Sequence, residues 1–200
     1  MDEPTAPVAP MPTAGYPVRF DVEYPEQLSR LLIFVKWLLA IPHFLILYVL
    51  GALLYIVTII AFVAILFTQK YPQGLFNFAV GVMRWQANAS AYIILLRDEY
   101  PPFSWEQGQY PVTFEVDYQP TVNRWAPLYK WLIVIPNLIV FIIVALVAYI
   151  LLIIGWFAIL FTGNMPRGIF DFVVGMMRWS ARINTYIYLM HDEYPPFSMK

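Results

Sequence analysis

Two short segments of the chain alternate strictly between apolar and polar residues. In 18–24 and again in 112–118, valine, phenylalanine or tyrosine occupies every second position, with charged residues or threonine between them. Successive side chains of a strand point to opposite faces, so this pattern predicts two β-strands that each have a buried and a water-exposed face. Because a two-stranded ribbon is marginally stable alone, we expect helix ends, the bilayer interface or a partner to cover the apolar faces.

A long apolar segment that a proline interrupts follows each predicted strand. Segment 31–67 contains one charged residue and segment 132–162 contains none, and runs of 18 or more apolar residues predict membrane spans. A straight helix over the first segment would be about 55 Å long, far beyond a hydrocarbon core of about 30 Å. We therefore predict helices that are kinked at Pro42 and Pro136 and cross the membrane after the kink. A tight hairpin around Gly51 is the alternative.

Two less apolar helices and two proline-rich tails complete the pattern. Segments 73–96 and 167–190 have helical periodicity and one polar stripe each, so each helix either lies in the interface plane or crosses the membrane with its stripe turned inward. The sequence DEYPPFS then forms an extended tail at 98–104 and at 192–198. The stripes consist of Asn77, Gly81, Arg84 and Asn88 and of Asp171, Gly175, Arg178 and Arg182.

This order of parts occurs twice because the chain contains an internal duplication. Segment 16–104 aligns with 110–198 without a gap, and nearly half of the positions are identical. We predict a disordered tail rich in proline and alanine at 1–15, a membrane repeat at 16–104, a linker at 105–109 and a second membrane repeat at 110–200. The fold class is therefore mostly α and integral to the membrane.

Composition excludes several classes of function. Of the 200 residues, 60% are hydrophobic and 12% are charged, and the net charge of −1 provides no basic surface for nucleic acid. The chain has no cysteine and only two histidines, and it contains no phosphate-binding, dinucleotide-binding or metalloprotease motif. We therefore expect no catalytic residue, no metal, no cofactor and no nucleic-acid partner.

The candidate contact residues lie on the two polar-striped helices. Arginine at membrane depth is unfavourable and is usually kept to bind a lipid phosphate, an anionic ligand or a partner. The alternative is an interfacial helix whose arginine reaches the headgroups or pairs with an acid. The candidate lipid or partner contacts are Arg84, Trp85, Arg178, Trp179 and Arg182, and the predicted interface anchors ahead of the long helices are Arg30, Lys36, Trp37, Arg124, Lys130 and Trp131.

Other titratable residues favour structural roles. Adjacent residues such as Asp98 and Glu99 point to opposite sides of an extended segment and cannot share one substrate proton. We expect them to form surface ion pairs with the basic residues ahead of the long helix, and their equivalents to do the same in the second repeat. His43 could bind a haem metal, but the second repeat has Asn137 at this position.

The stretch FTGNMPRGIFDFVVGMMRWSARINTYIYLMHDEYPPFS resembles the bacterial membrane family catalogued as domain of unknown function 4389. In that family a long apolar segment ends in a Thr-Gly turn, an amphipathic helix with regularly placed Arg and Tyr follows, and a Pro-Phe-Ser-like tail closes the unit. The resemblance covers both repeats, although the first has Gln69 where the second has Gly163. It implies placement in the bacterial inner membrane and no particular activity.

These patterns favour a non-enzymatic, multi-pass membrane protein that acts as an accessory, scaffold or interaction subunit. Its expected partners are the lipid bilayer and other membrane proteins or further copies of itself. A small transporter or lipid-binding protein with a site between the repeats is the alternative, since duplicated helical units often form a central site; a membrane enzyme has less support. If each repeat has two membrane-entering helices, the distribution of lysine and arginine predicts cytoplasmic strands and termini.

Overall fold

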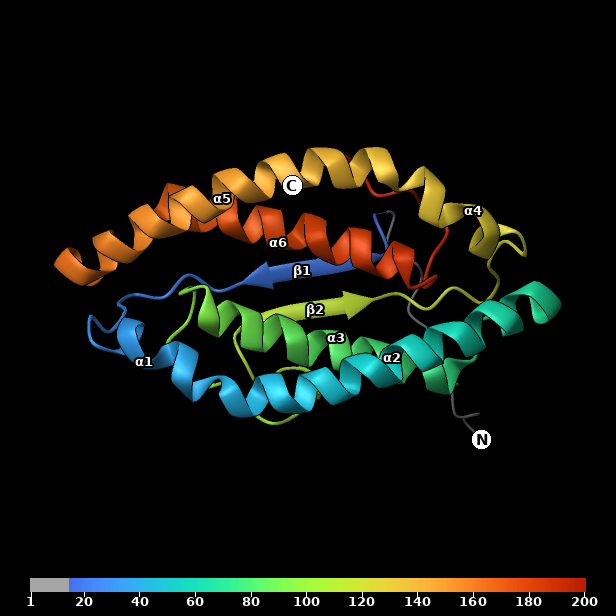
Figure 1. Ribbon diagram of the computed structural model, residues 1–200, viewed down its shortest axis with the longest axis horizontal. Helices are drawn as coiled ribbons and strands as arrows, with labels where there is room; N and C mark the ends of the chain where they lie inside the picture. Colours follow the sequence, from blue (N-terminus) through green and yellow to red (C-terminus); the bar gives the residue numbers. More distant parts are fainter. Residues whose placement is uncertain (1–14) are drawn as a thin grey trace, which may run out of the picture.

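The computed structural model describes residues 15–200, so the predicted disordered tail lies outside the described residues except for Gly15. The described chain is mostly helical and contains one two-stranded sheet (Figure 1). The elements are β1 (Val18–Val22), α1 (Leu32–Leu39), α2 (Ile41–Thr68), α3 (Gln73–Ile93), β2 (Val112–Val116), α4 (Ala126–Ile133), α5 (Ile135–Thr162) and α6 (Arg167–Ile187).

Strands β1 and β2 pair with each other in an antiparallel sheet. Phe20 lies opposite Phe114, and these two residues occupy equivalent positions in the two repeats. A local two-fold axis therefore passes between them. The predicted alternation is confirmed, because Val18, Phe20 and Val22 are buried while the residues between them are exposed.

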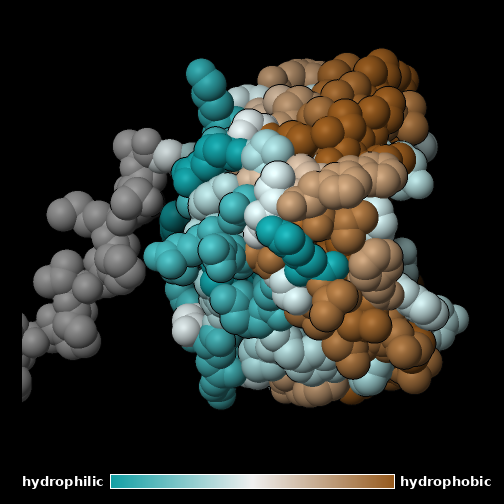
Figure 2. Space-filling view, turned by 90° about the vertical axis from the view of Figure 1, so that its left-hand side faces the viewer, coloured by the Kyte–Doolittle hydropathy of each residue, from teal (hydrophilic) through white to brown (hydrophobic). Residues whose placement is uncertain are grey.

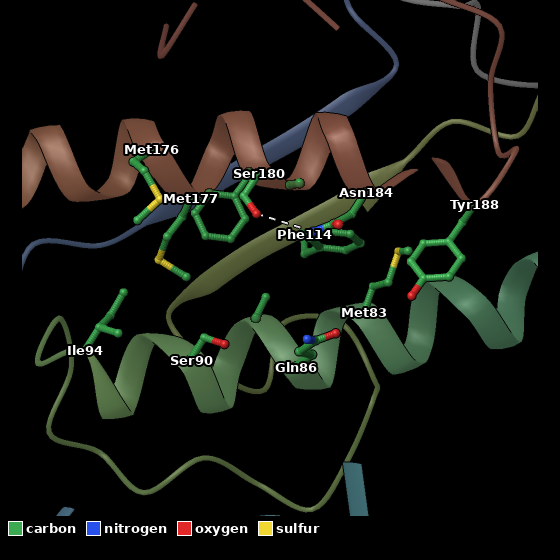
Figure 3. A pocket seen from close by; sticks show the side chains of 13 residues that line it. Met83, Gln86, Ser90, Ile94, Phe114, Met176, Met177, Ser180, Asn184 and Tyr188 are labelled. Atoms are coloured by element: carbon green, nitrogen blue, oxygen red, sulfur yellow. Dashed lines mark hydrogen bonds between the residues drawn. The ribbon is translucent and has the colours of Figure 1, made fainter. Parts of the chain in front are cut away.

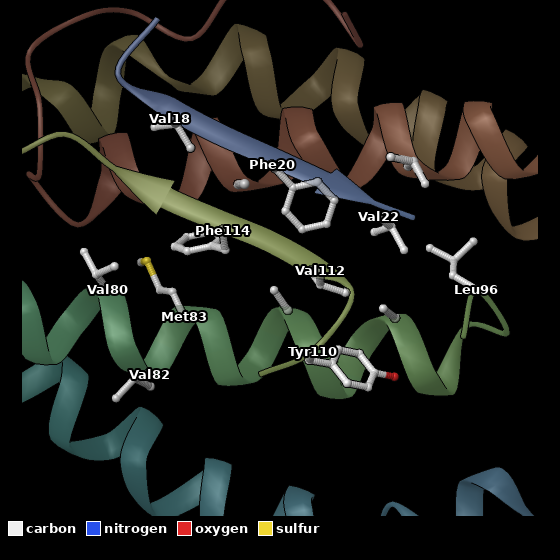
Figure 4. Packing of buried hydrophobic residues seen from close by; sticks show 14 of the residues in the cluster. Val18, Phe20, Val22, Val80, Val82, Met83, Leu96, Tyr110, Val112 and Phe114 are labelled. Carbon is white, nitrogen blue, oxygen red and sulfur yellow. The ribbon is translucent and has the colours of Figure 1, made fainter. Parts of the chain in front are cut away.

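The apolar face of the sheet packs against the sides of α3 and α6 rather than against helix ends. Figure 4 shows Phe20 and Phe114 pointing from the strands into the space beside Met83 and Val80 of α3. Strand β2 of the second repeat contacts α3 of the first, and β1 of the first repeat contacts α6 of the second. The two repeats are therefore interlocked, since each provides the strand that packs on the other's helix.

Each long apolar segment is divided between a short helix and a long helix, with a break just before the proline. Helix α1 ends at Leu39 and α2 begins at Ile41, with Pro42 in its first turn, where a missing N–H removes no helical hydrogen bond. The kink is thus confirmed, and the alternative hairpin is wrong because Gly51 lies inside α2. Among residues 15–200, Leu32–Thr68 and Ile135–Thr162 are the two helical stretches long and apolar enough to cross a membrane, which supports membrane association.

Helices α2 and α5 run in opposite directions along the two sides of the molecule (Figure 1). The end of α2 meets the segment before α4, where the Val122 N–H donates to the Gln69 oxygen at 2.9 Å. The end of α5 meets the segment before α1, where the Leu28 N–H donates to the Gly163 oxygen at 2.8 Å. Gln69 and Gly163 both have positive φ and end their helices, as left-handed caps do.

Candidate functional site

The arginines of the two polar stripes bind the backbone of the other repeat. The Arg84 guanidinium donates to the oxygens of Phe114 at 3.0 Å and Trp105 at 2.8 Å. In the second repeat, the Arg178 guanidinium donates to the oxygen of Phe20 at 2.8 Å and also to that of Met199. Each arginine thus joins the other repeat's strand to the tail that follows its own helix.

Glycines in the stripes allow these tails to approach closely. A Cβ atom on Gly81 would lie 3.1 Å from the Trp105 side chain, and one on Gly175 would lie 2.8 Å from the Cβ of Met199. The second distance is shorter than real Cβ contacts, so this position requires glycine. The polar stripes therefore face the strands and tails of the protein itself.

The tryptophans beside the arginines point into the protein. The Trp85 indole donates to Nδ1 of His43 at 2.9 Å, and the Trp179 indole donates to Oδ1 of Asn137 at 2.8 Å. His43 and Asn137 thus serve as equivalent hydrogen-bond acceptors, and the His43 ring also stacks on Phe103 with centroids 4.1 Å apart. These contacts engage Nδ1 and the ring face of His43, whereas its Nε2 is buried and has no hydrogen-bond partner among the described residues.

Arg182, the remaining candidate contact, is also buried. Its guanidinium donates to the backbone oxygen of Ser198 at 3.2 Å and lies 5.2 Å from the centroid of the Tyr16 ring. Burial lowers its pKa. The arginines and tryptophans proposed to contact lipid or a partner are thus all engaged within the chain.

The predicted anchors divide into an exposed and a buried group. Trp37 and Trp131 are 63% and 62% exposed, and the two anchor arginines are exposed as well. Lys36 and Lys130 are each only 1% exposed, so they do not reach outward as the anchor prediction requires. The exposed tryptophans and arginines are Trp37, Trp131, Arg30 and Arg124.

Each buried lysine is held by an acid and a carbonyl group. Lys36 lies 2.7 Å from an Asp98 oxygen and donates to the Arg97 carbonyl at 2.6 Å, and Lys130 lies 2.9 Å from Asp192. The predicted pairs of Asp98 and Asp192 are therefore present, but their lysines are buried instead of lying at the surface. Glu99 pairs with Arg97 and not with a basic residue ahead of the long helix. A buried charge requires such partners, which is why the lysines turn inward. Burial lowers the pKa of Lys130, and Asp192 partly opposes this shift.

A cleft lies between α3 and α6 on the local two-fold axis (Figure 3). Phe20 and Phe114 contribute to its lining from the apolar face of the sheet, so the cleft lies on the side away from the charged face. Its volume is about 300 Å³. Equivalent residues of the two repeats line opposite walls, namely Met83 and Met177, Gln86 and Ser180, Ala87 and Ala181, and Ser90 and Asn184.

The polar groups in the cleft are uncharged. Gln86 and Ser90 provide hydrogen-bonding groups from α3, and Ser180 and Asn184 provide them from α6, where the Asn184 amide donates to Ser180 at 3.3 Å. Tyr188 is the single titratable residue in the lining. Within residues 15–200 no three His, Cys, Asp or Glu side chains gather in a way that could hold a metal ion. The cleft can therefore offer hydrogen bonds and apolar contacts to a neutral ligand.

The charged stripe does not include these cleft residues, so the sequence analysis did not identify them. Gln86 and Ser90 lie one helical turn apart on another face of α3, and Ser180 and Asn184 repeat this spacing in α6. Both repeats have two uncharged polar residues at these equivalent positions, and this recurrence is the sequence feature that could have indicated the cleft.

The architecture defines a two-repeat, mostly helical protein with a central cleft and two apolar stretches able to span a membrane. Residues 30–104 and 124–199 match the family described as Domain of unknown function (DUF4389). The chain belongs to this family and contains two tandem copies of its domain, as the sequence resemblance indicated. No curated protein and no solved structure matched the chain.

Proposed function

We propose that this protein is a non-enzymatic membrane protein that binds an uncharged amphiphile in the cleft between α3 and α6. The observation that carries the proposal is the placement of this cleft on the two-fold axis, where both repeats contribute equivalent polar residues. In keeping with the family resemblance, the proposal places the protein in the bacterial inner membrane, with the charged face of the sheet toward the cytoplasm.

The lining indicates the chemistry of the ligand. Amide and hydroxyl groups can bind an alcohol, ester, amide or quinone oxygen, whereas no lysine, arginine or carboxylate in the lining would neutralise a charged head. Met83, Met176 and Met177 provide flexible apolar contacts that adapt to a hydrocarbon tail. The expected ligand therefore has a neutral polar head and an apolar body.

An accessory or scaffold role is the second candidate. The sequence suggested this role because the polar stripes and the strand faces need a partner. Within the described chain the other repeat is that partner, since Arg84 and Arg178 bind its backbone and the two strands pair. The observation that still favours it is the exposed apolar surface of α2 and α5. Hydrocarbon could cover this surface as well as a partner protein could.

Native mass spectrometry of the protein extracted from its membrane in mild detergent tests the proposal. The wild-type protein should carry a neutral amphiphile, and Ala87→Phe and Ala181→Phe should lose most of it because the new ring fills the cleft. Ser90→Ala should weaken retention without filling the cleft. Ala52→Phe is the matched control, because Ala52 is exposed on α2 and is not among the cleft residues.

The outcomes separate the two candidates. Equal retention of a small molecule by the wild type and both filling variants would place the ligand elsewhere. Isolation of the protein with larger membrane proteins and without any amphiphile would support the accessory role instead. Unfolding temperatures of the variants, measured beside that of Ala52→Phe, show whether a lost ligand merely reflects a damaged fold.

A further inference from the structure

The charged strands and the apolar helices both extend along the length of the molecule. Figure 1 shows β1 and β2 roughly parallel to the axes of α2 and α5, with α3 and α6 between them. Each long helix has 28 residues, about 42 Å at 1.5 Å per residue, and contains no charged side chain. The outward face of β1 carries Arg19 and Asp21, and that of β2 carries Glu115.

The extended segment 98–122 spans the same distance as α2. It begins beside α1, where Asp98 contacts Lys36. It ends beside the last turn of α2, where Val122 donates to the Gln69 oxygen. Between these points it contains β2, an edge strand, and exposed residues that include Glu99 and Glu106.

A crossing orientation of α2 is therefore physically unfavourable. If α2 crossed the bilayer, segment 98–122 would have to cross it too, because its two ends lie at the two ends of α2. An open sheet edge exposes unpaired backbone groups that hydrocarbon cannot satisfy, and charged side chains at the bilayer centre are strongly disfavoured. The same argument applies to α5 and β1, so a crossing orientation of α5 is unfavourable as well.

The surface is divided along the helices and not across their ends. Figure 2, a view along the long axis, shows hydrophilic residues on one side of the molecule and hydrophobic residues on the other. The exposed apolar residues extend over the full length of both long helices. They include Leu45, Tyr48, Ile56, Ile59 and Phe67 of α2 and Ile139, Ile142, Leu146, Ile150, Ile154 and Phe161 of α5.

We infer that the protein is monotopic, with α2 and α5 lying parallel to the membrane plane inside one leaflet and the charged face of the sheet in water. One leaflet contributes about 15 Å of hydrocarbon, which accommodates a helix about 10–12 Å wide. Interfacial helices usually have one polar face. Helix α2 has none, which suits a helix immersed in acyl chains beneath a polar layer formed by other elements. This placement is independent of any ligand in the cleft.

The two orientations differ in which side of the membrane the end of α2 reaches. Single-cysteine variants are convenient because the chain contains no cysteine. Gln27→Cys lies before α1, Lys70→Cys and Asn164→Cys lie after α2 and α5, and Gln107→Cys marks the linker; all four positions are exposed. A membrane-impermeant maleimide is applied to right-side-out and to inverted membrane vesicles.

All four cysteines should react in the same vesicle preparation if the helices lie in the plane. Because α2 and α5 are antiparallel, labelling of Lys70→Cys and Asn164→Cys in different preparations would establish helices that cross in this fold, and it would overturn the inference. Labelling of both in one preparation, with Gln107→Cys labelled only in the other, would overturn it as well. The multi-pass arrangement predicted from the sequence corresponds to this second outcome.

Depth measurements provide the second test. Spin labels at cysteines replacing Leu45, Ile56 and Phe67 of α2 report relative exposure to oxygen, which enriches in hydrocarbon, and to a water-soluble nickel chelate. In vesicles of phosphatidylethanolamine and phosphatidylglycerol, the three labels should have similar depths. A central label much deeper than the other two would indicate crossing. Chelate exposure at all three, as in water, would show that no leaflet covers α2, and either result would overturn the inference.

Discussion

The Arg84 guanidinium donates a 3.0 Å hydrogen bond to the backbone oxygen of Phe114, a residue of the other repeat. Arg178 makes the equivalent bond to Phe20 at 2.8 Å. Phe20 and Phe114 face each other across the sheet, so both arginines act at the centre of the pairing between repeats. Each arginine therefore fastens its own helix to the strand that the other repeat supplies.

Removal of either arginine should loosen this connection. We expect Arg84→Met and Arg178→Met each to lower the free energy of unfolding by about 1.5–3 kcal/mol, the usual contribution of hydrogen bonds to a charged group. Denaturant unfolding in detergent measures the change. Arg124→Met is the control, because Arg124 is exposed and its replacement should change stability by less than about 1 kcal/mol. A loss at Arg84 or Arg178 no larger than this control would mean that the bonds between repeats contribute little.

The sequence predicted the features that depend on local patterns. Alternation specified the buried face of β1 and β2, and Pro42 and Pro136 marked the kinks because proline is tolerated in the first turn of a helix. It could not specify which helix each strand packs on. The two repeats are so similar that packing within a repeat and packing between repeats satisfy the same hydrophobic pattern.

The direction of a side chain was equally beyond local reasoning. Lys36 and Trp37 together are typical of an interface anchor, yet Trp37 is exposed while Lys36 points inward to Asp98, which lies 62 residues later in the chain. The cleft was missed for a related reason, since Gln86 and Ser90 become significant only when α6 lies opposite them. Both features arise from contacts between distant segments.

The buried pair of Lys36 and Asp98 should be sensitive to loss of its negative charge. Asp98→Asn retains an oxygen that can accept from the Ser29 N–H, as Asp98 does now, but it leaves the lysine charge without its partner. We expect a loss of about 3–5 kcal/mol in the free energy of unfolding, the usual effect of breaking a buried ion pair. Lys36→Met should cost less, because it removes the charge that needs a partner. Unfolding of the two single variants and the double variant measures the coupling, and additive effects would contradict it.

His191 should make the stability of the protein depend on pH, because it is fully buried and has Nε2 3.0 Å from the Thr185 hydroxyl. Burial, with a smaller contribution from the Lys130 charge, lowers the pKa of His191 from its ordinary value of 6.5 to about 3. The folded state then binds fewer protons than the unfolded state between these two values. Its stability should therefore fall as the pH drops below 6.5, and the loss should continue to about pH 3.

For this one group the loss between pH 7 and pH 5 should be about 2 kcal/mol, because each pH unit below the unfolded pKa contributes about 1.4 kcal/mol. His191→Gln cannot take up this proton, so its stability should fall less steeply over the same interval while the carboxylates of both proteins titrate alike. Unfolding measured at half-unit steps from pH 7 to pH 5 gives the two slopes. Parallel slopes would mean that His191 gains its proton as easily in the folded protein as in the unfolded chain, which its burial should prevent.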